Sequence, residues 1–582
     1  MNHSKLTLEQ IAAFDLNKQY QLFRQFNPQK THDFNKFKQQ PLISVVVPIY
    51  NASSQWLNLT IKSVVNQSYP HWQLILQDDG SYAQSTKECL KHWQDKDPRI
   101  LINYSESNQG VGSALNQAIG CSNGSFIALL EHMDRLDENA LWFCVNSLNQ
   151  KQSTGVLYTD EDEIDASGNH LNPYLKPEFN LDALLSFNYI KNLCVIRKSL
   201  GDKVKWFRSG FDGAHTYDLL LRLLSFNPQI ERIPQVLYHK MKFSSPSAKL
   251  SNKDYQDITI KAALQDYIFH NGLHATVQQG LFDFSFHIKR QVHENQTVSI
   301  IIPFKDQFSL LKNCMDSLLA ITSHRHYEVL LINNQSSDSD VLEYAKQLTC
   351  DFKHVLLFDF DESFNFSRLN NIAAKKASGE FLLFLNNDTK IIHHDWLQEM
   401  VSHIQREKVG AVGAKLLYAD DTIQHSGMVA SSKSVMHLGR NEKDGAVGYF
   451  QRANYVQNVS VCTGACLMVK KSLFFEVDGF DEALFPITFN DVDLCLKIRK
   501  AGYLIVYTPF AKLYHYESKS RGSDAEPEKL KRYLVEQQRY RHKWADFFEN
   551  GDPYYHPNFV HVFEVVCFNV NLEEYTLRDT AI

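Results

Sequence analysis

The sequence repeats itself after 255 residues, and this internal duplication limits the possible folds more than any other feature. Three short segments recur at that spacing and in the same order, so that residue 44 is matched by residue 299. A constant offset over this length indicates duplication of a whole domain, and we predict two copies of one fold in tandem. The matching segments are 44–48 with 299–303, Asp78-Asp79 with Asn333-Asn334, and 124–126 with 379–381.

Each copy alternates strand patterns with helix patterns. In the first copy, runs of β-branched and apolar residues predict strands at 43–51, 72–81 and 124–134, and helical patterns at 57–67 and 111–120 lie between them. This alternation is typical of an α/β fold with a mostly parallel sheet and right-handed crossovers. The predicted fold class is therefore α/β, with two such domains in tandem.

Later landmarks set the predicted domain boundaries. The segment 217–222 is matched by 492–497, an offset of 275, so the second copy has gained about twenty residues, which we place in the Gly-rich stretch 430–455. The N-terminal segment 1–40 is expected to form a helix that packs on the body rather than on a membrane, because its polar face is not strongly basic. The remaining predictions are a first domain at 41–280, a second at 297–520, and a C-terminal helix at 526–548 within a tail that spans 521–582.

Composition excludes several classes of protein. A hydrophobic share of 44%, a charged share of 22% and a net charge of -6 are those of a soluble globular protein, with no expectation of nucleic acid as a partner. The ten cysteines include no C-x-x-C pair, which favours reduced thiols and a cytoplasmic location. The sequence shows neither a signal peptide nor a run of 18 apolar residues, so we expect no membrane span.

The stretch 381–390 is the strongest candidate for a functional site. Residues 381–385 are an unbroken apolar run, as in a strand buried on both faces of a parallel sheet. Asn386, Asn387 and Asp388 follow it, at the edge of the sheet where open α/β folds bind ligands. The alternative is that an Asn-Asn-Asp run is ordinary strand-to-turn chemistry.

The repeated segments resemble family-2 glycosyltransferases of the GT-A fold. The resemblance covers both copies, is closer in the second, and is specific only when its motifs are taken together. It points to bacterial transferases that build O-antigen, capsule and related rhamnose-containing polysaccharides. The motifs are SVVVPIYN and LQDDGS in the first copy, and FNFSRLNNIAA, FLLFLNNDTK, VGAVGAKLLY, IQHSG, FNDVDLCLKIRKAGY and LYHYESKSRG in the second.

The resemblance implies a nucleotide-sugar donor, UDP- or dTDP-linked, and a divalent metal ion, Mn²⁺ or Mg²⁺, that neutralises the departing diphosphate. Of the family's Asp-x-Asp element only the last carboxylate remains, so Asp388 is the expected main metal ligand. His515 matches a family histidine that completes the metal site. A histidine that merely caps a loop is the alternative for His515.

The resemblance also assigns a catalytic base and a nucleotide site in the second copy. Inverting transfer needs a base that takes the acceptor proton, and Asp491 matches the family's base at the start of a helix. The alternative for Asp491 is a helix cap, a role that Asp493 could fill instead. The expected nucleotide contacts are Pro303, Asp306, Asn333 and Asn387, with Arg368 and Asn370 as weaker candidates. Asn333 replaces the family's usual Asp, which leaves the base preference open.

The first copy differs at the same positions. The 255-residue offset aligns Asp388 with Met133, a poor ligand for a hard cation, and the 275-residue offset aligns Asp491 with Thr216, which is no base at neutral pH. Either Glu131 and Asp134 restore metal binding and the enzyme is bifunctional, or the first copy is degenerate and binds acceptor, nucleotide or another protein. The second interpretation is favoured because ligand and base are altered together. The acidic run 159–163 matches a familiar segment of tandem members, or is a solvated turn.

We therefore predict an inverting, metal-dependent glycosyltransferase with its chemistry in the second domain. The expected substrates are a nucleotide sugar and an oligosaccharide or lipid-linked glycan acceptor of a bacterial surface polysaccharide. The expected location is the cytoplasm, with peripheral association with the inner face of the plasma membrane or with other polysaccharide-assembly enzymes left open. The competing classes are a non-catalytic glycan-binding scaffold and a nucleotide-dependent oxidoreductase, the latter disfavoured because no G-x-G-x-x-G fingerprint follows the first strand.

Overall fold

The chain forms two compact units whose segments are interleaved along the sequence. The computed structural model describes residues 7–242, 253–293, 296–432, 434–516, 527–562 and 565–571. Unit 1 consists of Met1–Phe179, Asn188–Leu273 and His556–Ile582, and unit 2 of Asn180–Phe187 and His274–Tyr555. The units therefore differ from the predicted linear domains, because a short helix of the first copy belongs to unit 2 and part of the predicted C-terminal tail belongs to unit 1.

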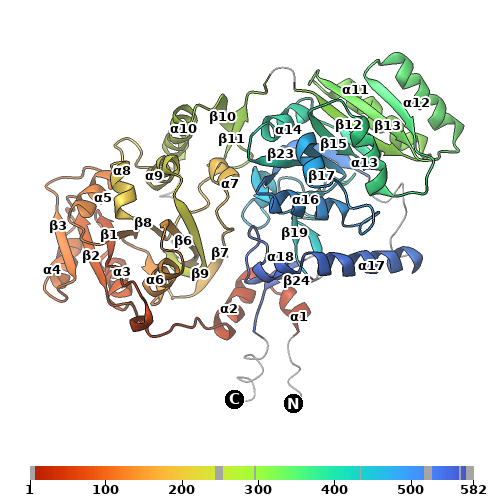
Figure 1. Ribbon diagram of the computed structural model, residues 1–582. Coiled ribbons are helices and arrows are strands. Elements are labelled where there is room, and N and C mark those ends of the chain that lie inside the picture. The colour runs from red at the N-terminus through yellow and green to blue at the C-terminus, as the bar shows by residue number, and fades with distance from the viewer. Residues whose placement is uncertain are drawn as a thin grey trace, which may run out of the picture. The chain divides into compact units, whose positions relative to one another are not determined.

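Unit 1 is built on a sheet with the strand order β3-β2-β1-β4-β8-β6-β9-β5, and β7 pairs with β6 (Figure 1). The pairs from β3 to β4 are parallel, whereas β8 runs antiparallel to both of its neighbours. The strands are β1 (Ile43–Ile49), β2 (Trp72–Asp78), β3 (Ile100–Tyr104), β4 (Phe126–Leu129), β5 (Arg135–Leu136), β6 (Thr154–Ile164), β7 (His170–Tyr174), β8 (Cys194–Arg197) and β9 (Gln229–Met241). The helices of this copy are α3 (Ser54–Val65), α4 (Gln84–Trp93), α5 (Val111–Gly120), α6 (Ala140–Gln150), α8 (Lys198–Lys203), α9 (His215–Leu223) and α10 (Lys253–His270).

Unit 2 repeats this order as β14-β13-β12-β15-β22-β17-β23-β16, and β18 and β21 pair with β17 and β23. The strands of this sheet are β12 (Val298–Phe304), β13 (Tyr327–Asn333), β14 (Val355–Asp359), β15 (Phe381–Leu385), β16 (Thr389–Ile391), β17 (Val409–Leu417), β18 (Ile423–His425), β21 (Gln457–Val459), β22 (Cys466–Lys470) and β23 (Leu504–His515). Two hairpins complete the unit, β10 (Ala275–Gln279) with β11 (Phe286–Arg290) and β19 (Met428–Ala430) with β20 (Val435–His437). The helices are α7 (Leu181–Ser186), α11 (Phe308–Ile321), α12 (Ser339–Asp351), α13 (Phe366–Lys376), α14 (Trp396–Ile404), α15 (Lys471–Glu476), α16 (Asn490–Lys500), α17 (Pro527–Lys543) and α18 (Ala545–Asn550).

The strand register confirms the predicted duplication and the α/β fold class. Ile43 of β1 lies opposite Trp72, and Val298 of β12 lies opposite Tyr327, so both pairs are related by the 255-residue offset found in the sequence. The β19–β20 hairpin lies at the start of the stretch where the second copy was expected to have gained residues.

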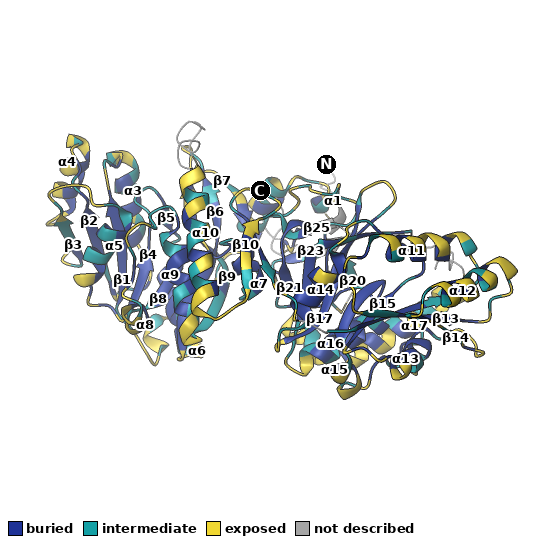
Figure 2. Cartoon of the chain, turned by 90° about the horizontal axis from the view of Figure 1, so that it is seen from above, coloured by how far each residue is buried: buried dark blue, intermediate teal, exposed yellow. Residues whose placement is uncertain are grey.

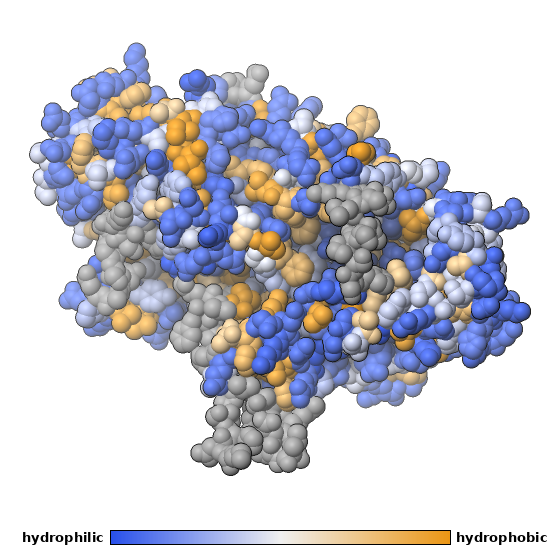
Figure 3. Space-filling view, turned by 180° about the vertical axis from the view of Figure 1, so that it is seen from behind, coloured by the Kyte–Doolittle hydropathy of each residue, from blue (hydrophilic) through white to orange (hydrophobic). Residues whose placement is uncertain are grey.

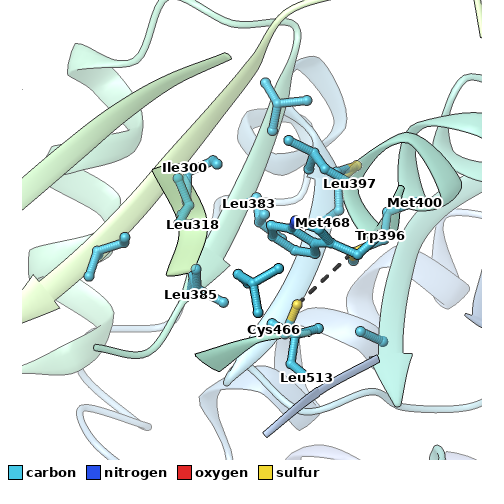
Figure 4. Packing of buried hydrophobic residues seen from close by; sticks show 14 of the residues in the cluster. Ile300, Leu318, Leu383, Leu385, Trp396, Leu397, Met400, Cys466, Met468 and Leu513 are labelled. Atoms are coloured by element: carbon cyan, nitrogen blue, oxygen red, sulfur yellow. Dashed lines mark hydrogen bonds between the residues drawn. The ribbon is translucent and has the colours of Figure 1, made fainter. Parts of the chain in front are cut away.

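Strand β12 explains why the first strand of a copy contains three consecutive apolar residues. Ile300 and Ile302 belong to the core on one face of the sheet, while Ile301 belongs to the core on the other. A strand covered by helices on both faces cannot alternate polar and apolar residues. Figure 2 shows the strands of the sheets buried beneath helices whose outer sides are exposed. Figure 4 shows Trp396 and Met400 of α14 packed near Leu383, Cys466 and Met468 of the unit 2 sheet.

The terminal segments pack on the folded units. Two short helices, α1 (Leu8–Ala12) and α2 (Leu16–Phe26), replace the one predicted N-terminal helix, because Asp15 caps α2 by accepting the backbone N–H of Lys18. Helix α2 packs within unit 1, as expected. The hairpin of β24 (Phe559–Val562) and β25 (Val565–Phe568) also belongs to unit 1. Among the described residues, none of the helices has the length and apolar character needed to cross a membrane. In Figure 3, hydrophilic side chains cover most of the visible face and hydrophobic ones gather in small groups.

Candidate active site

The end of strand β15 places three polar residues at the carboxyl edge of the unit 2 sheet. All of β15 is buried, between β12 on one side and β22 on the other. The Asn386 N–H donates to the carbonyl of Ala465 at 3.0 Å, and the hydroxyl of Thr389 donates to the carbonyl of Asn386 at 2.8 Å. These bonds hold Asn386, Asn387 and Asp388 in a fixed turn before β16.

His515, the last residue of β23, lies directly beside Asp388. In the antiparallel pairing of β16 with β23, Thr389 lies opposite His515, which brings the preceding residue against the imidazole. The Nε2 atom of His515 is 3.1 Å from Oδ1 of Asp388 and 3.3 Å from Nδ2 of Asn386. The structure therefore brings the two predicted metal ligands together.

Gln424 determines which nitrogen of His515 carries the proton. Its Oε1 lies 2.6 Å from Nδ1 of His515, and its Nε2 donates to the His515 carbonyl at 3.4 Å. Because an amide oxygen can only accept, Nδ1 donates to Gln424, and Nε2 is the nitrogen directed at the Asp388 carboxylate. A carboxylate oxygen beside an imidazole nitrogen is a pair of ligands that fits a divalent ion such as Mn²⁺.

Asp491 lies in the first turn of α16, close to the same edge of the sheet. Its Oδ2 accepts the N–H of Gly464 at 2.8 Å and its Oδ1 accepts the N–H of Val492 at 2.8 Å. Gly464 immediately precedes Ala465, whose carbonyl binds Asn386, so one short loop joins Asp491 to the turn before β16. Burial raises the pKa of the Asp491 carboxyl, which the two backbone N–H groups partly offset.

A cavity of about 220 Å³ opens beside this turn. Two of the predicted nucleotide contacts, Pro303 and Asn387, line this cavity. Asn334 also lines it: its Nδ2 donates to the carbonyls of Phe360 and Glu362, while its buried Oδ1 has no hydrogen-bond partner among the described residues. The lining residues are Pro303, Phe304, Lys305, Asn334, Phe364, Phe366, Asn386 and Asn387.

Four predicted nucleotide contacts lie outside this lining. The Asp306 carboxylate accepts the N–H groups of Ser337 and Asp338, and Asn333 bonds to Asp359 and Ser336, so both side chains hold loops. The other two contact neighbours around helix α13: Arg368 pairs with Glu362 and Glu482, and the buried Asn370 donates to the carbonyl of Phe366.

Sequence reasoning assigned the Asn333-Asn334 pair to nucleotide recognition but chose Asn333 as the contact, and strand alternation could have favoured Asn334. Asn333 is the last residue of β13 and bonds along the sheet edge to Asp359, the last residue of β14. The following residue projects the other way, because successive side chains in extended chain point to opposite faces. The phenylalanines at 364 and 366 lie in the motif FNFSRLNNIAA, but nothing in the sequence assigned them to the pocket.

In unit 1 the strand register corrects the alignment of the metal position. Arg135 lies opposite His239 as Thr389 lies opposite His515, so the equivalent of Asp388 is Asp134 and not Met133. One residue has been added between β4 and β5. Asp134 is turned inward: its carboxylate accepts the hydroxyl of Tyr238 at 2.6 Å and the N–H of Met241 at 2.9 Å, and burial raises its pKa to about 6.

The nucleotide position of unit 1 is also engaged by the chain itself. Asp79, the counterpart of Asn334, accepts the N–H groups of Gln109 and Gly110 with its carboxylate. Thr216, the counterpart of Asp491, lies in the first turn of α9. In unit 1 the carboxylates at the metal and nucleotide positions are therefore bonded to the chain itself, and the base position has a threonine.

The acidic run of unit 1 is buried in strand β6, so it is not a solvated turn. Asp160 accepts from His556 of the C-terminal segment, and Glu161 pairs with the buried Lys176. Asp162, His170 and His239 form a group that could hold a metal ion. In the structure, however, Asp162 lies 2.6 Å and 2.7 Å from the Nδ1 atoms of His239 and His170 and also accepts from Tyr20 and pairs with Arg24.

The fold and the arrangement of the unit 2 site define the class of enzymes that transfer a sugar from a nucleotide donor. The chain belongs to glycosyl transferase family 2, whose profile matches residues 44–201 and 299–477, more than half of the chain. The predicted family and the tandem GT-A fold are thereby confirmed.

Two curated relatives match nearly the whole chain. The uncharacterized protein y4gI of Sinorhizobium fredii is 38% identical over 89% of this chain and 57% of its own length. The O-antigen biosynthesis protein RfbC of Myxococcus xanthus is 35% identical over 90% of this chain and 40% of its own length. The chain thus spans about half the length of these relatives. Among solved structures, Staphylococcus aureus TarS 1–349 has a TM-score of 0.32 and 17% identity over 39% of this chain and 65% of its own.

Proposed function

We propose that unit 2 is an inverting, metal-dependent glycosyltransferase that extends a bacterial surface polysaccharide. The observation that carries this proposal is the pairing of Asp388 with His515 beside a cavity, with Asp491 joined to the same turn through residues 464 and 465. In this arrangement one carboxylate serves the diphosphate and a separate one serves the acceptor.

The residues divide the chemistry between them. The Asp491 carboxylate takes the proton of an acceptor hydroxyl as that oxygen attacks the anomeric carbon of the donor. The bond from this carbon to the diphosphate oxygen breaks, and the nucleoside diphosphate leaves with the electron pair while the anomeric configuration inverts. A divalent ion held by Asp388 and His515 would supply positive charge to the leaving diphosphate.

The cavity supports a uracil or thymine base. Both amide hydrogens of Asn334 are committed to backbone carbonyls, so its buried Oδ1 is the one polar atom of this side chain left for a ligand, as an acceptor. A ring N–H, as in uracil or thymine, matches it, whereas the equivalent nitrogen of cytosine is itself an acceptor. This contact disfavours a cytosine base, and with the family resemblance we retain a UDP- or dTDP-sugar as donor.

The same contacts support a single catalytic unit. Asp134 occupies the right position for a second metal site, and the group of Asp162, His170 and His239 could also hold an ion, which favours a bifunctional enzyme. The Asp134 oxygens are already bonded to Tyr238 and Met241, Asp79 is bonded to the backbone, and Thr216 replaces the base. Unit 1 therefore acts without catalysis.

Our proposal for the acceptor is supported by the similarity to a relative, and our proposal for the cellular location by the use of nucleotide sugars. The similarity to an O-antigen biosynthesis protein supports an oligosaccharide or lipid-linked glycan as acceptor. A cytoplasmic site of action, at the inner face of the membrane or beside other assembly enzymes, follows from the use of nucleotide sugars.

The experiment is a panel of nucleotide sugars with Mn²⁺ or Mg²⁺, scored for nucleoside diphosphate release by the wild type, Asp491→Asn and Thr216→Ala. We expect one donor to be used, a loss of about 10²–10⁴-fold in Asp491→Asn, and no loss in Thr216→Ala. Full turnover by Asp491→Asn would remove unit 2 as the catalytic unit. Residual release of a second nucleotide would favour the bifunctional enzyme, and absent nucleotide binding would favour the scaffold.

A further inference from the structure

Helix α17 packs against the irregular segment 486–489 that leads into Asp491. Glu536 of α17 is 1% exposed, and its Oε2 accepts both the backbone N–H and the hydroxyl of Thr488, each at 2.7 Å. Hydrogen bonds to an ionised carboxylate are stronger than those between neutral groups. Glu536 therefore fixes the backbone three residues before Asp491.

The next residue adopts a backbone conformation that needs support. Phe489 has φ +58° and ψ +5°, in the left-handed region that bulky side chains rarely adopt. Its ring stacks on Tyr540 of α17, with centroids 5.0 Å apart and planes 18° apart, and also contacts Tyr533 at 5.4 Å. Because such conformations persist only where surrounding contacts hold them, α17 maintains the bend that starts helix α16.

The C-terminal end of α17 holds the other side of Asp491. The fully buried Asp493 accepts the indole N–H of Trp544 at 3.0 Å and pairs with Lys543 at 2.8 Å. Contacts from one segment therefore fix residues 488, 489 and 493. The carboxylate of Asp491 contacts the Gly464 N–H only if the turn between these residues keeps its position.

Unit 1 provides an internal comparison. Its helix α10 packs on α9 and contains no acidic residue between Asp257 and Asp266. Asp218, the counterpart of Asp493, is held instead by Arg208 and Arg222. Unit 1, which has Thr216 in place of the base, thus also lacks a carboxylate in the middle of α10, the helix that packs on α9.

We propose that Glu536 is a positioning residue for sugar transfer, which holds the Thr488–Asn490 turn so that the Asp491 carboxylate stays bonded to Gly464 and directed at the acceptor. This inference rests on the proposed role of Asp491. Glu536 itself touches neither substrate nor metal in this assignment.

The first test needs no substrate. Amide hydrogen exchange of the full chain is compared for the wild type, Glu536→Gln and Glu536→Ala, with Glu528→Gln as the matched control because Glu528 is an exposed carboxylate on the same helix. We expect faster exchange confined to residues 486–492, larger in the Ala variant than in the Gln variant, and none in the control. Unchanged exchange in that segment, or faster exchange across the whole of unit 2, would overturn the proposal.

The second test separates positioning from stability. With the donor that the wild type uses, we expect kcat to fall about tenfold in Glu536→Gln and further in Glu536→Ala, with nucleotide Kd unchanged. The acid limb of the kcat profile should move to higher pH in Glu536→Ala, because loss of the Gly464 N–H bond raises the pKa of Asp491. Loss of kcat with an unmoved limb and a lower Tm would mean that Glu536 acts only on stability.

A double variant distinguishes this inference from the proposed function. Glu536→Gln should cost nothing further in Asp491→Asn, because both changes act on one base. If Asp491→Asn keeps full activity, the proposed function fails. If Asp491→Asn is inactive while Glu536→Gln matches the wild type, only the role of Glu536 fails.

Discussion

The Nε2 atom of His515 faces the Oδ1 atom of Asp388 at 3.1 Å, while the Nδ1 atom of the same ring lies 2.6 Å from Gln424. The Nδ1 atom therefore donates to a neutral amide, while Nε2 is directed at a carboxylate. In unit 1 the corresponding His239 has Asp162 at its Nδ1 atom instead, also at 2.6 Å. The supporting contact at Nδ1 is therefore charged in unit 1 and neutral in unit 2, while Nε2 lies near a carboxylate in both, at 3.8 Å from Asp137 in unit 1.

Removing the charge of Asp388 should weaken metal-dependent nucleotide binding. We expect Asp388→Asn to weaken Mn²⁺-dependent binding of UDP or dTDP by tenfold or more, about 1.4 kcal/mol, because a hard cation loses its anionic ligand. Calorimetric titrations with Mn²⁺ and with EDTA measure this. Asp134→Asn is the matched control and should leave binding unchanged, whereas equal losses in both variants would mean that the two units share the metal.

Gln424 should control metal affinity without touching the metal. Residues that orient a metal-binding histidine typically contribute 10–100-fold to affinity. We therefore expect Gln424→Ala to raise the Mn²⁺ concentration needed for half-maximal activity by that factor, with kcat restored at saturating Mn²⁺. A loss of activity that added Mn²⁺ does not relieve would contradict the proposed role of the Gln424 contact.

Asn334 should read the nucleobase. In the wild type we expect UDP to bind more tightly than CDP, because the Asn334 Oδ1 atom accepts a ring N–H that cytosine lacks. Asn334→Ala should lower this preference. The measure is the ratio of the Kd values for UDP and CDP, because a loosened loop would weaken the binding of both nucleotides equally. Asn333→Ala, which lies outside the cavity lining, should keep the preference, and its loss there would transfer the role to Asn333.

The sheet and the strand end before Asp388 could be predicted from the sequence, because strands buried on both faces appear as unbroken apolar runs. The duplication could be predicted because these runs recur at a constant offset. The sequence also placed Asp388 and His515 in one site, through the resemblance. It misaligned Met133 with Asp388, because one added residue between β4 and β5 shifts the register while leaving the strand pattern intact. Strand pairing reveals such a shift, and residue spacing does not.

Side-chain direction and long-range packing were beyond the sequence patterns. Asn333 and Asn334 are identical neighbours, and only the hydrogen bond to Asp359 shows which of them faces the sheet edge. Glu536 lies 45 residues beyond Asp491 in the sequence. Its helix has the pattern of an ordinary amphipathic helix, which gives no sign of a contact with the segment before Asp491. The inclusion of residues 180–187 in unit 2 likewise depends on tertiary contacts, such as the bidentate pair of Arg406 with Asp182.

Acid should destabilise unit 2 through buried neutral histidines. His403 is fully buried beside Glu399, with 3.0 Å between its Nε2 atom and the carboxylate, and burial lowers the pKa of its imidazole to about 4. A histidine whose folded pKa lies below its unfolded value of about 6.5 contributes stability above pH 6.5, and this contribution is lost as the pH falls toward 4. Between pH 7.5 and pH 5 the loss for one such group is about 2 kcal/mol.

The substitution His403→Gln should therefore flatten the pH dependence of unfolding. Glutamine can still donate to Glu399 but cannot take up a proton in the unfolded chain. Denaturant unfolding of the wild type and the variant at pH 7.5 and pH 5 should give a stability difference that shrinks by about 2 kcal/mol at the lower pH. The exposed His542 is the control, because His542→Gln should leave the slope unchanged. A constant difference for His403→Gln would mean that His403 is protonated in the folded chain, as an ion-pair partner of Glu399.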